Sequence, residues 1–150
     1  MDDKRTCFPR FYFVATADLL DILSNGNIPS KVMPHLPKIF QAIEDVKLDE
    51  TTGVRPAALG MKSCVGIEYV PYSEPFKLMG KVEGYMQDVI DNMRKTLRLI
   101  AGDSLKRSMA KPRTDWLKED PSQCMLLVGL TSWVSDVEKG LSNNTMPATL

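Results

Sequence analysis

Phe8-Pro9-Arg10-Phe11-Tyr12-Phe13-Val14 is the stretch on which the predicted fold depends, because it holds four of the chain's nine Phe and Tyr residues. Aromatic and β-branched residues at this density favour a β-strand. The alternation of a strand puts Phe11 and Phe13 on one face and the other side chains on the opposite face. Both faces are largely apolar, so we expect the strand to be covered on both sides. Arg10 is the polar exception, and Pro9, which lacks an N–H group, belongs at the start of the strand or on a sheet edge.

Two helical segments are predicted after this strand. The first runs from Thr16, which can act as the N-cap, through Leu23, and it ends at Asn25-Gly26-Asn27 because Gly and Asn tolerate the left-handed conformation. The second begins near Pro34, since proline is tolerated in the first turn of a helix. Apolar residues at spacings of three and four predict its buried stripe, which consists of Leu36, Ile39, Phe40, Ile43 and Val46.

A β-hairpin is predicted between Ala57 and Tyr72, with its turn near residues 63–66. Leu59 and Met61 alternate with other residues before the turn, and Ile67, Tyr69 and Pro71 alternate after it. A single hairpin is only marginally stable, so we expect it to pair with the strand at residues 8–14, with packing on the helices as the alternative.

The C-terminal half is predicted to be helical. One helix covers residues 81–100 and can end at Gly102, and a short helical turn at residues 112–119 carries Trp116. Asp120-Pro121 starts a further helix, which ends near residue 141. Its apolar stripe consists of Leu126, Leu127, Leu130, Trp133, Val134, Val137 and Leu141. The patterns together predict an α+β fold: an elongated, mostly helical bundle with a small antiparallel sheet formed by strand 8–14 and the hairpin at about 57–72.

Composition excludes several classes of protein. The chain has 150 residues, 43% of them hydrophobic and 25% charged, which is typical of one globular domain. Lys plus Arg and Asp plus Glu both number 19, and this neutral balance argues against binding to nucleic acid or an anionic membrane. The sequence has no apolar run near 20 residues and no signal-peptide pattern, so an intracellular protein is predicted. Cys7, Cys64 and Cys124 are predicted to be reduced and mostly buried.

The sequence predicts no catalytic, cofactor-binding or metal site. It has neither the G-x-x-x-x-G-K-[ST] nor the G-x-G-x-x-G phosphate-binding pattern. His35 is the only histidine, and a lone histidine is more often a packed or surface residue than a base. The spaced carboxylates Asp18 and Asp21 are expected on a solvated helix face. A thiol enzyme built on Cys7 or Cys64 with His35 remains the least favoured alternative.

The stretch from Phe8 to Phe13, with the following Ala17-Asp18-Leu19-Leu20-Asp21-Ile22-Leu23-Ser24, resembles the linker region of dynein heavy chains. In that family an FPRF(Y/F)F strand precedes a D/E-L-L-(D/E)-I-L helix. The resemblance extends from about Lys4 to Leu141 through short blocks in the family's order. These are His35-Leu36 with Ile39-Phe40, Gly60-Met61 with Glu68-Tyr69-Val70-Pro71, Gly80-Lys81-Val82-Glu83, residues 93–97, and residues 133–138.

The resemblance implies a linker-like segment at residues 4–141, followed by a loose tail at 142–150. The segment Asp21 to Asn27 is most similar to axonemal heavy chains of the outer-arm β-type. A linker is a mechanical element that bends and straightens on a ring of AAA modules while the motor moves along a microtubule. The resemblance therefore implies a fragment, a truncated gene product or a divergent paralogue without the ring. It also implies no enzymatic activity of its own and a cytoplasmic location in the axoneme of a cilium or flagellum.

The partners implied by the resemblance are the AAA ring of the same heavy chain and other dynein subunits, with the microtubule contacted only indirectly. Nucleic acid and membranes are not expected as partners. A free-standing helical adaptor is the alternative to the linker role. The residues expected to have structural or interaction roles are Arg10, Phe11, Tyr12, Phe13, Trp116 and Trp133.

Overall fold

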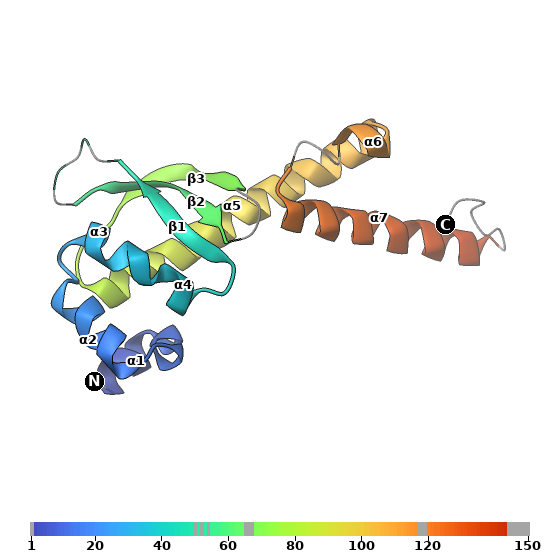
Figure 1. The fold of residues 1–150 in the computed structure, drawn as a ribbon. Coiled ribbons are helices and arrows are strands. Elements are labelled where there is room, and N and C mark those ends of the chain that lie inside the picture. The colour runs from blue at the N-terminus through green and yellow to red at the C-terminus, as the bar shows by residue number, and fades with distance from the viewer. Residues whose placement is uncertain are drawn as a thin grey trace. The chain divides into compact units, whose positions relative to one another are not determined.

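The computed structural model describes residues 2–49, 51, 53, 55–64, 68–116 and 120–143, and they adopt an α+β fold (Figure 1). The helices of this part of the chain accompany one small antiparallel sheet, which confirms the predicted fold class. The chain forms two compact units, unit 1 at Met1–Thr96 and unit 2 at Leu97–Leu150. The boundary between them falls inside helix α5 (Val82–Ala110).

The stretch at residues 8–14 is a turn of 3-10 helix, so the predicted strand is wrong. Helix α1 (Asp2–Cys7) is followed by the 3-10 helix η1 (Pro9–Phe13), in which Pro9 occupies the first turn. Phe8, Phe11 and Val14 are buried. Their spacing of three residues equals the period of a 3-10 helix, which puts them on one side. The expected cover on both faces is also wrong, because Tyr12 and Phe13 are exposed.

Helix α2 (Thr16–Ser24) has the predicted position and ends at Asn25 as predicted. Its N-cap is Ala15, which makes no side-chain capping bond, so the capping role expected for Thr16 is wrong. Leu19 and Ile22 are its buried residues.

Three short helical pieces replace the second predicted helix. They are α3 (Pro29–Val32), the 3-10 helix η2 (Met33–His35) and α4 (Leu36–Ile39). Each piece has a proline in its first turn. Proline fits that position but cannot donate a hydrogen bond to a preceding turn, so each new proline ends the previous piece.

The sheet has the strand order β1-β2-β3 and is antiparallel throughout. Strands β2 (Ala57–Ser63) and β3 (Tyr69–Lys77) form the predicted hairpin, although residues 65–67 lie outside the described part. Their partner is β1 (Ile43–Leu48) and not the stretch at residues 8–14. The helix predicted at β1 is wrong. A register irregularity between Ile43 and Asp45 allows Ile43 and Val46, three residues apart, both to be buried, which imitates a helical pattern.

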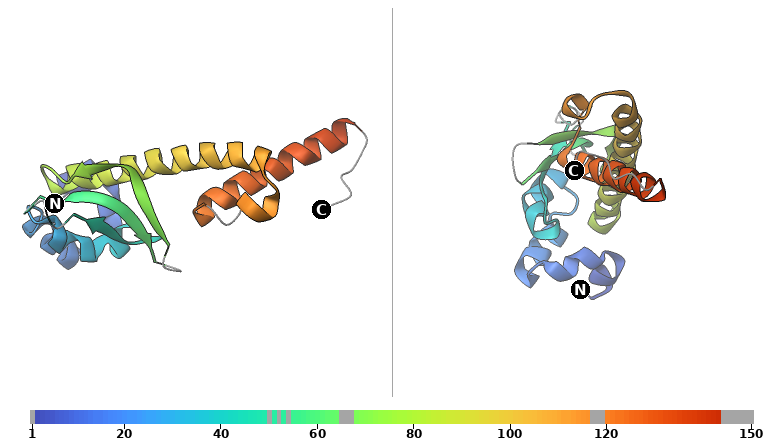
Figure 2. Two further views of the ribbon diagram at one scale, coloured as in Figure 1. Left: turned by 90° about the horizontal axis from the view of Figure 1, so that it is seen from above. Right: turned by 90° about the vertical axis from the view of Figure 1, so that its right-hand side faces the viewer.

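The first part of α5, which belongs to unit 1, runs along the sheet in the views of Figures 1 and 2. Thr96 is buried, and its Oγ1 accepts a hydrogen bond from the backbone N–H of Ser73 in β3 at 3.0 Å. The α5 residues of the unit 1 core are Val82, Tyr85, Met86, Val89 and Ile90, and the other elements contribute Phe8, Phe11, Leu19, Ile22, Val32, Leu36, Val46, Ala58 and Leu78.

Unit 2 contains the rest of α5, helix α6 (Arg113–Trp116) and helix α7 (Ser122–Ser142). Helix α5 continues through Gly102 to Ala110, so the predicted end at Gly102 is wrong. The start of α7 after Pro121 is confirmed. An apolar stripe is normally the buried face of a helix, but most of the stripe predicted for α7 is exposed: Leu126, Leu127, Leu130, Trp133, Val134 and Leu141. Most of the tail, residues 144–150, lies outside the described residues.

Candidate functional site

Arg10 of η1 contacts the end of α4. Its Nη1 donates a hydrogen bond to the Ile39 carbonyl oxygen at 3.4 Å, and its guanidinium carbon lies 5.0 Å from the centroid of the Phe40 ring. Cation–π contacts of this kind contribute about 0.5–1 kcal/mol, and more when desolvated. Arg10 therefore joins two segments that are about thirty positions apart.

The three aromatic residues after Arg10 divide into two groups. Phe11 is fully buried, and its ring lies edge-on to Phe8 with the ring centroids 4.8 Å apart. Tyr12 and Phe13 are 62% and 79% exposed. The Arg5 guanidinium carbon lies 5.9 Å from the centroid of the Tyr12 ring. Phe11 is thus a core anchor, whereas Tyr12 and Phe13 are available on the surface of unit 1.

A polar cluster that the sequence did not predict joins α2 to η2 and α4. His35 Nε2 lies 2.9 Å from Asp21 Oδ2, and His35 Nδ1 lies 3.8 Å from Asp18 Oδ1. Lys38 Nζ donates to Asp18 Oδ1 at 2.7 Å. The two carboxylates are three positions apart and therefore share one side of α2. His35 comes from η2 and Lys38 from α4, so only tertiary folding shows that these charges meet.

Three long-range polar contacts close unit 1, and we call them the closing contacts. Lys4 pairs with Glu83, Arg55 donates to Asn27 Oδ1 at 3.2 Å, and the Tyr85 hydroxyl donates to the Gly26 carbonyl oxygen at 3.1 Å. Arg55 also donates to the carbonyl oxygens of Leu78 and Gly80, at 3.3 and 3.0 Å. Lys4 and Gly26 connect α1 and the segment after α2 to the start of α5. Arg55, which precedes β2, connects its own segment to the segment after α2 and to the segment before α5. No local sequence signal announces them, because their partners are far apart in the chain.

Burial and pairing alter the pKa values of two groups in the closing contacts. Burial raises the pKa of Tyr85 well above its ordinary value, so its hydroxyl remains a hydrogen-bond donor to Gly26. Burial by itself would raise the pKa of Glu83, but the hydrogen bond and charge of Lys4 outweigh it, and the pKa lies below its ordinary value. Glu83 is therefore held as a carboxylate.

A groove of about 970 Å³ follows strand β1 in unit 1. Beside it, the Tyr69 ring covers Gly60 so closely that a Cβ at position 60 would lie 2.6 Å from the Tyr69 hydroxyl oxygen. Lys47 Nζ lies 5.5 Å from the centroid of the Tyr69 ring. The groove is lined by both acidic and basic side chains. Its lining consists of Ser30, Met33, Pro34, residues 44–49, Leu59, Lys62 and Tyr69.

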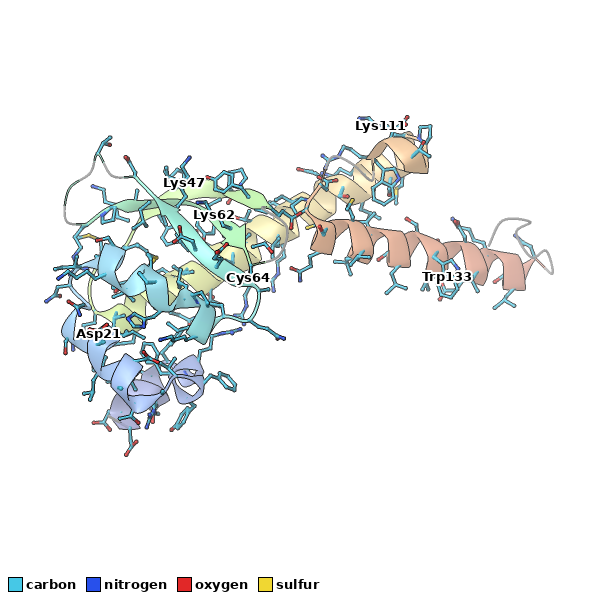
Figure 3. The ribbon with its side chains drawn as sticks, in the orientation of Figure 1. Asp21, Lys47, Lys62, Cys64, Lys111 and Trp133 are labelled. Carbon is cyan, nitrogen blue, oxygen red and sulfur yellow. The ribbon has the colours of Figure 1, made fainter. Side chains whose placement is uncertain are left out.

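The two tryptophans of unit 2 differ in their surroundings. Trp116 is 3% exposed, and Asp120 after it pairs with Arg107 of α5. Trp133 is 47% exposed, and Figure 3 shows its side chain projecting outward from α7. Trp133 therefore lies on a surface, although it belongs to the apolar stripe that the sequence predicts for this helix.

No group of three or more His, Cys, Asp or Glu residues in the described ranges could hold a metal ion. No helix among those residues is long and apolar enough to cross a membrane. Cys7 and Cys64 are exposed and only Cys124 is buried, so the expectation of mostly buried thiols is wrong. The ring nitrogens of His35 contact Asp18 and Asp21, and no contact within the described part joins them to Cys7 or Cys64.

Comparisons with known proteins agree with the resemblance seen in the sequence. The family model "Dynein heavy chain, N-terminal region 2" matches residues 1–104. The dynein alpha chain of the flagellar outer arm of Chlamydomonas reinhardtii is 51% identical over 145 residues, which is 95% of this chain and 3% of that protein. The ciliary dynein beta chain of Tripneustes gratilla is 41% identical, and human dynein axonemal heavy chain 9 is 38% identical, each over 91% of this chain and 3% of the relative.

These relatives are named as flagellar, ciliary and axonemal dyneins, and two of them are outer-arm or beta chains, so the predicted axonemal outer-arm similarity is confirmed. The chain spans about 3% of the length of each of these relatives. Because the family model covers residues 1–104, which include all of unit 1, the chain belongs to the dynein heavy chain family.

Proposed function

We propose that this chain is a non-catalytic mechanical segment of an axonemal dynein heavy chain. In this proposal it is part of the linker that bends and straightens on the AAA ring, and it works in the axoneme of a cilium or flagellum. Its partners would be the AAA ring of the same heavy chain and other dynein subunits, and it would reach the microtubule only through them.

The closing contacts are the observation that carries this proposal. A segment that transmits force must resist deformation, and contacts between distant parts of the chain resist it better than local ones. Lys4 and Glu83 are 79 positions apart, and Tyr85 and Gly26 are 59 apart. Together with the buried face of α5, these contacts connect distant parts of unit 1 and so make it resist deformation. The absence of a G-x-x-x-x-G-K-[ST] motif from the sequence supports a role without its own nucleotide chemistry.

The proposal is tested by removing one closing contact with little change in side-chain volume. Tyr85→Phe in an axonemal heavy chain that carries this segment deletes the hydroxyl and leaves the buried Gly26 carbonyl oxygen without this donor, at a cost of about 1–3 kcal/mol. Tyr12→Phe is the matched control, since Tyr12 is exposed. We expect Tyr85→Phe to lower microtubule gliding velocity while basal ATPase activity stays unchanged, and Tyr12→Phe to change neither.

Two results would contradict the mechanical role. An equal loss of ATPase activity and gliding velocity in Tyr85→Phe would indicate general unfolding. An unchanged gliding velocity would show that the contact between Tyr85 and Gly26 has no role in force transmission. One observation favours the adaptor alternative: the exposed apolar face of α7 is available to bind a partner protein.

A further inference from the structure

The sheet of unit 1 has two outer strands, β1 and β3, and each has one edge that no other strand of the described residues occupies (Figure 1). The outer edge of a sheet carries backbone N–H and C=O groups to which an extended chain can add as a further strand. Such a strand could come from a second copy of this chain or from another part of a longer heavy chain. Whether an edge accepts it depends on what the outward N–H groups already bind.

The hydrogen bonds of the middle strand show which backbone groups of its neighbours point outward. Ser63 of β2 donates its N–H to the Glu68 carbonyl oxygen, just before β3, at 3.0 Å, so residue 63 faces β3. Successive residues of a strand direct their backbone groups to opposite sides, so residues 60 and 62 face β1 and residue 61 faces β3. A residue of β1 opposite residue 61, or a residue of β3 opposite residue 60, therefore directs its own N–H and C=O groups outward.

The edge of β1 is occupied by one of its own carboxylates. The pairing of β1 with β2 runs without interruption only through Asp45, Val46 and Lys47, with a register irregularity on each side. Val46 lies opposite residue 61, so its N–H points outward, and Asp45 Oδ1 accepts that N–H at 2.8 Å. Asp45 Oδ2 lies 4.0 Å from Lys62 Nζ of the neighbouring strand. A further strand would have to displace a charge-assisted hydrogen bond to use this N–H, and the irregularities restrict its pairing to a short stretch.

The edge of β3 is occupied by prolines and by helix α5. Pro71 pairs with Gly60 and therefore stands at an outward position, where it has no N–H to donate. Beyond Pro71 the register is irregular. In that stretch the Ser73 N–H donates to Thr96 Oγ1 of α5 at 3.0 Å, and Pro75 again has no N–H. Thr96 is 2% exposed, so a buried helix side chain binds the N–H that an added strand would need.

We infer that both edges of this sheet are closed to strand addition. A partner of unit 1, whether a second copy or another part of a longer heavy chain, then contacts it through side chains and not by extending the sheet. Charged side chains, prolines, register irregularities and a covering helix are the means by which natural sheets prevent unwanted pairing, and all of them are found at these two edges. The inference uses only the pairing and contacts of unit 1, and it does not rest on the proposed linker role.

Residue-resolved amide hydrogen exchange, corrected for intrinsic rates, tests each edge in the folded chain. Asp45→Ala removes the acceptor of the Val46 N–H, so we expect this amide to exchange about tenfold faster. Asp45→Asn keeps a carbonyl oxygen at that place and should leave the rate nearly unchanged. Thr96→Val and Thr96→Ser form the same pair for the Ser73 amide, because valine lacks the hydroxyl and serine keeps it. An amide that exchanges as slowly in the alanine or valine variant as in the wild type would overturn the closure of that edge.

Strand addition itself is tested with a variant whose two edges are opened. Asp45→Ala combined with Pro71→Val frees the Val46 N–H and adds an outward N–H at residue 71. Asp45 is half-buried and Pro71 is exposed, so the circular dichroism spectrum should stay that of the wild type. Lys77→Val is the control, because it puts the same apolar side chain at an exposed position of β3 without adding an N–H.

Thioflavin T fluorescence and the infrared amide band of intermolecular β-sheet are the readouts, since both respond to strand pairing and not to contacts between helices. We expect both signals to rise with concentration in the opened variant and to stay at the baseline in the wild type and in Lys77→Val. An opened variant that forms no intermolecular β-sheet would overturn the proposal, as would a folded wild-type chain that forms it equally.

Discussion

Replacing Phe11 by alanine tests whether the stretch at residues 8–14 is a 3-10 helix with one buried side. Phe11 is 0% exposed and packs edge-on to Phe8. Removing a buried Phe side chain typically costs about 3–5 kcal/mol, from lost transfer free energy and the cavity that remains. Phe13→Ala is the matched control, because Phe13 has the same side chain two positions away and is 79% exposed. Its cost should stay within about 0.5 kcal/mol.

These costs predict a clear difference in urea unfolding. A unit of this size has a free energy of unfolding of roughly 5–15 kcal/mol, so Phe11→Ala removes a large share of it. With a urea dependence of about 1–3 kcal/mol per molar, the unfolding midpoint of unit 1 should fall by at least about 1 M. The midpoint of Phe13→Ala should stay near that of the wild type.

Amide hydrogen exchange is the assay that can assign the loss to unit 1. We expect faster exchange in peptides covering residues 8–24 and 69–96 of Phe11→Ala. Trp116 and Trp133 both belong to unit 2, so tryptophan fluorescence follows that unit independently. Equal destabilisation by Phe11→Ala and Phe13→Ala would refute the reasoning, because a strand buried on both sides, and not a one-sided 3-10 helix, would produce that result.

Three other predictions follow from the structure. Gly60→Ala should displace the Tyr69 ring, whose hydroxyl oxygen would lie 2.6 Å from the new Cβ, and Tyr69→Ala should relieve the effect in a double-mutant cycle of unfolding free energies. The pKa of Glu83 is lower when folded than its ordinary 4.5, so its contribution to stability is complete above that value and is lost as the pH falls through the folded pKa. Thermal unfolding of Lys4→Met at pH 7 and at pH 3 checks this, and a loss of stability as large at pH 3 as at pH 7 would contradict it. Isothermal titration calorimetry of the isolated chain with Mg-ATP should show no binding, because the sequence has no phosphate-binding loop; micromolar affinity would disprove this.

The sequence predicted the elements whose pattern is local. Alternation on both sides of a turn predicted the β2–β3 hairpin, and repeats at three and four residues predicted α2, the start of α5 and α7. The short blocks that resemble dynein heavy chains predicted the family, since their identity and order are properties of the chain alone. The structural roles expected of Arg10, Phe11 and Trp116 stay predictions; in the structure Arg10 contacts Ile39, and Phe11 and Trp116 are buried.

Two errors have a common physical origin. Phe8, Phe11 and Val14 at intervals of three fit a 3-10 helix, but the density of aromatic residues favoured a strand. Ile43 and Val46, also three apart, favoured a helix but lie in a strand with a register irregularity. A spacing of three is compatible with both structures. A segment with this spacing forms a strand when a neighbouring strand can pair with its backbone, and β1 pairs with β2 in this way.

The sequence by itself therefore determined the family, the fold class and the elements defined by local periodicity. Tertiary structure alone decided which strand completes the sheet, that the charges of Asp18, Asp21, His35 and Lys38 meet, and that the closing contacts bind Gly26, Asn27 and Glu83. It also decided which apolar face of α7 is buried, since its composition is apolar on both. The reason is that periodicity reports only which side chains share a face. The segment that packs against that face comes from a distant part of the chain. The packing free energy between the two segments is gained only when they meet in the folded structure.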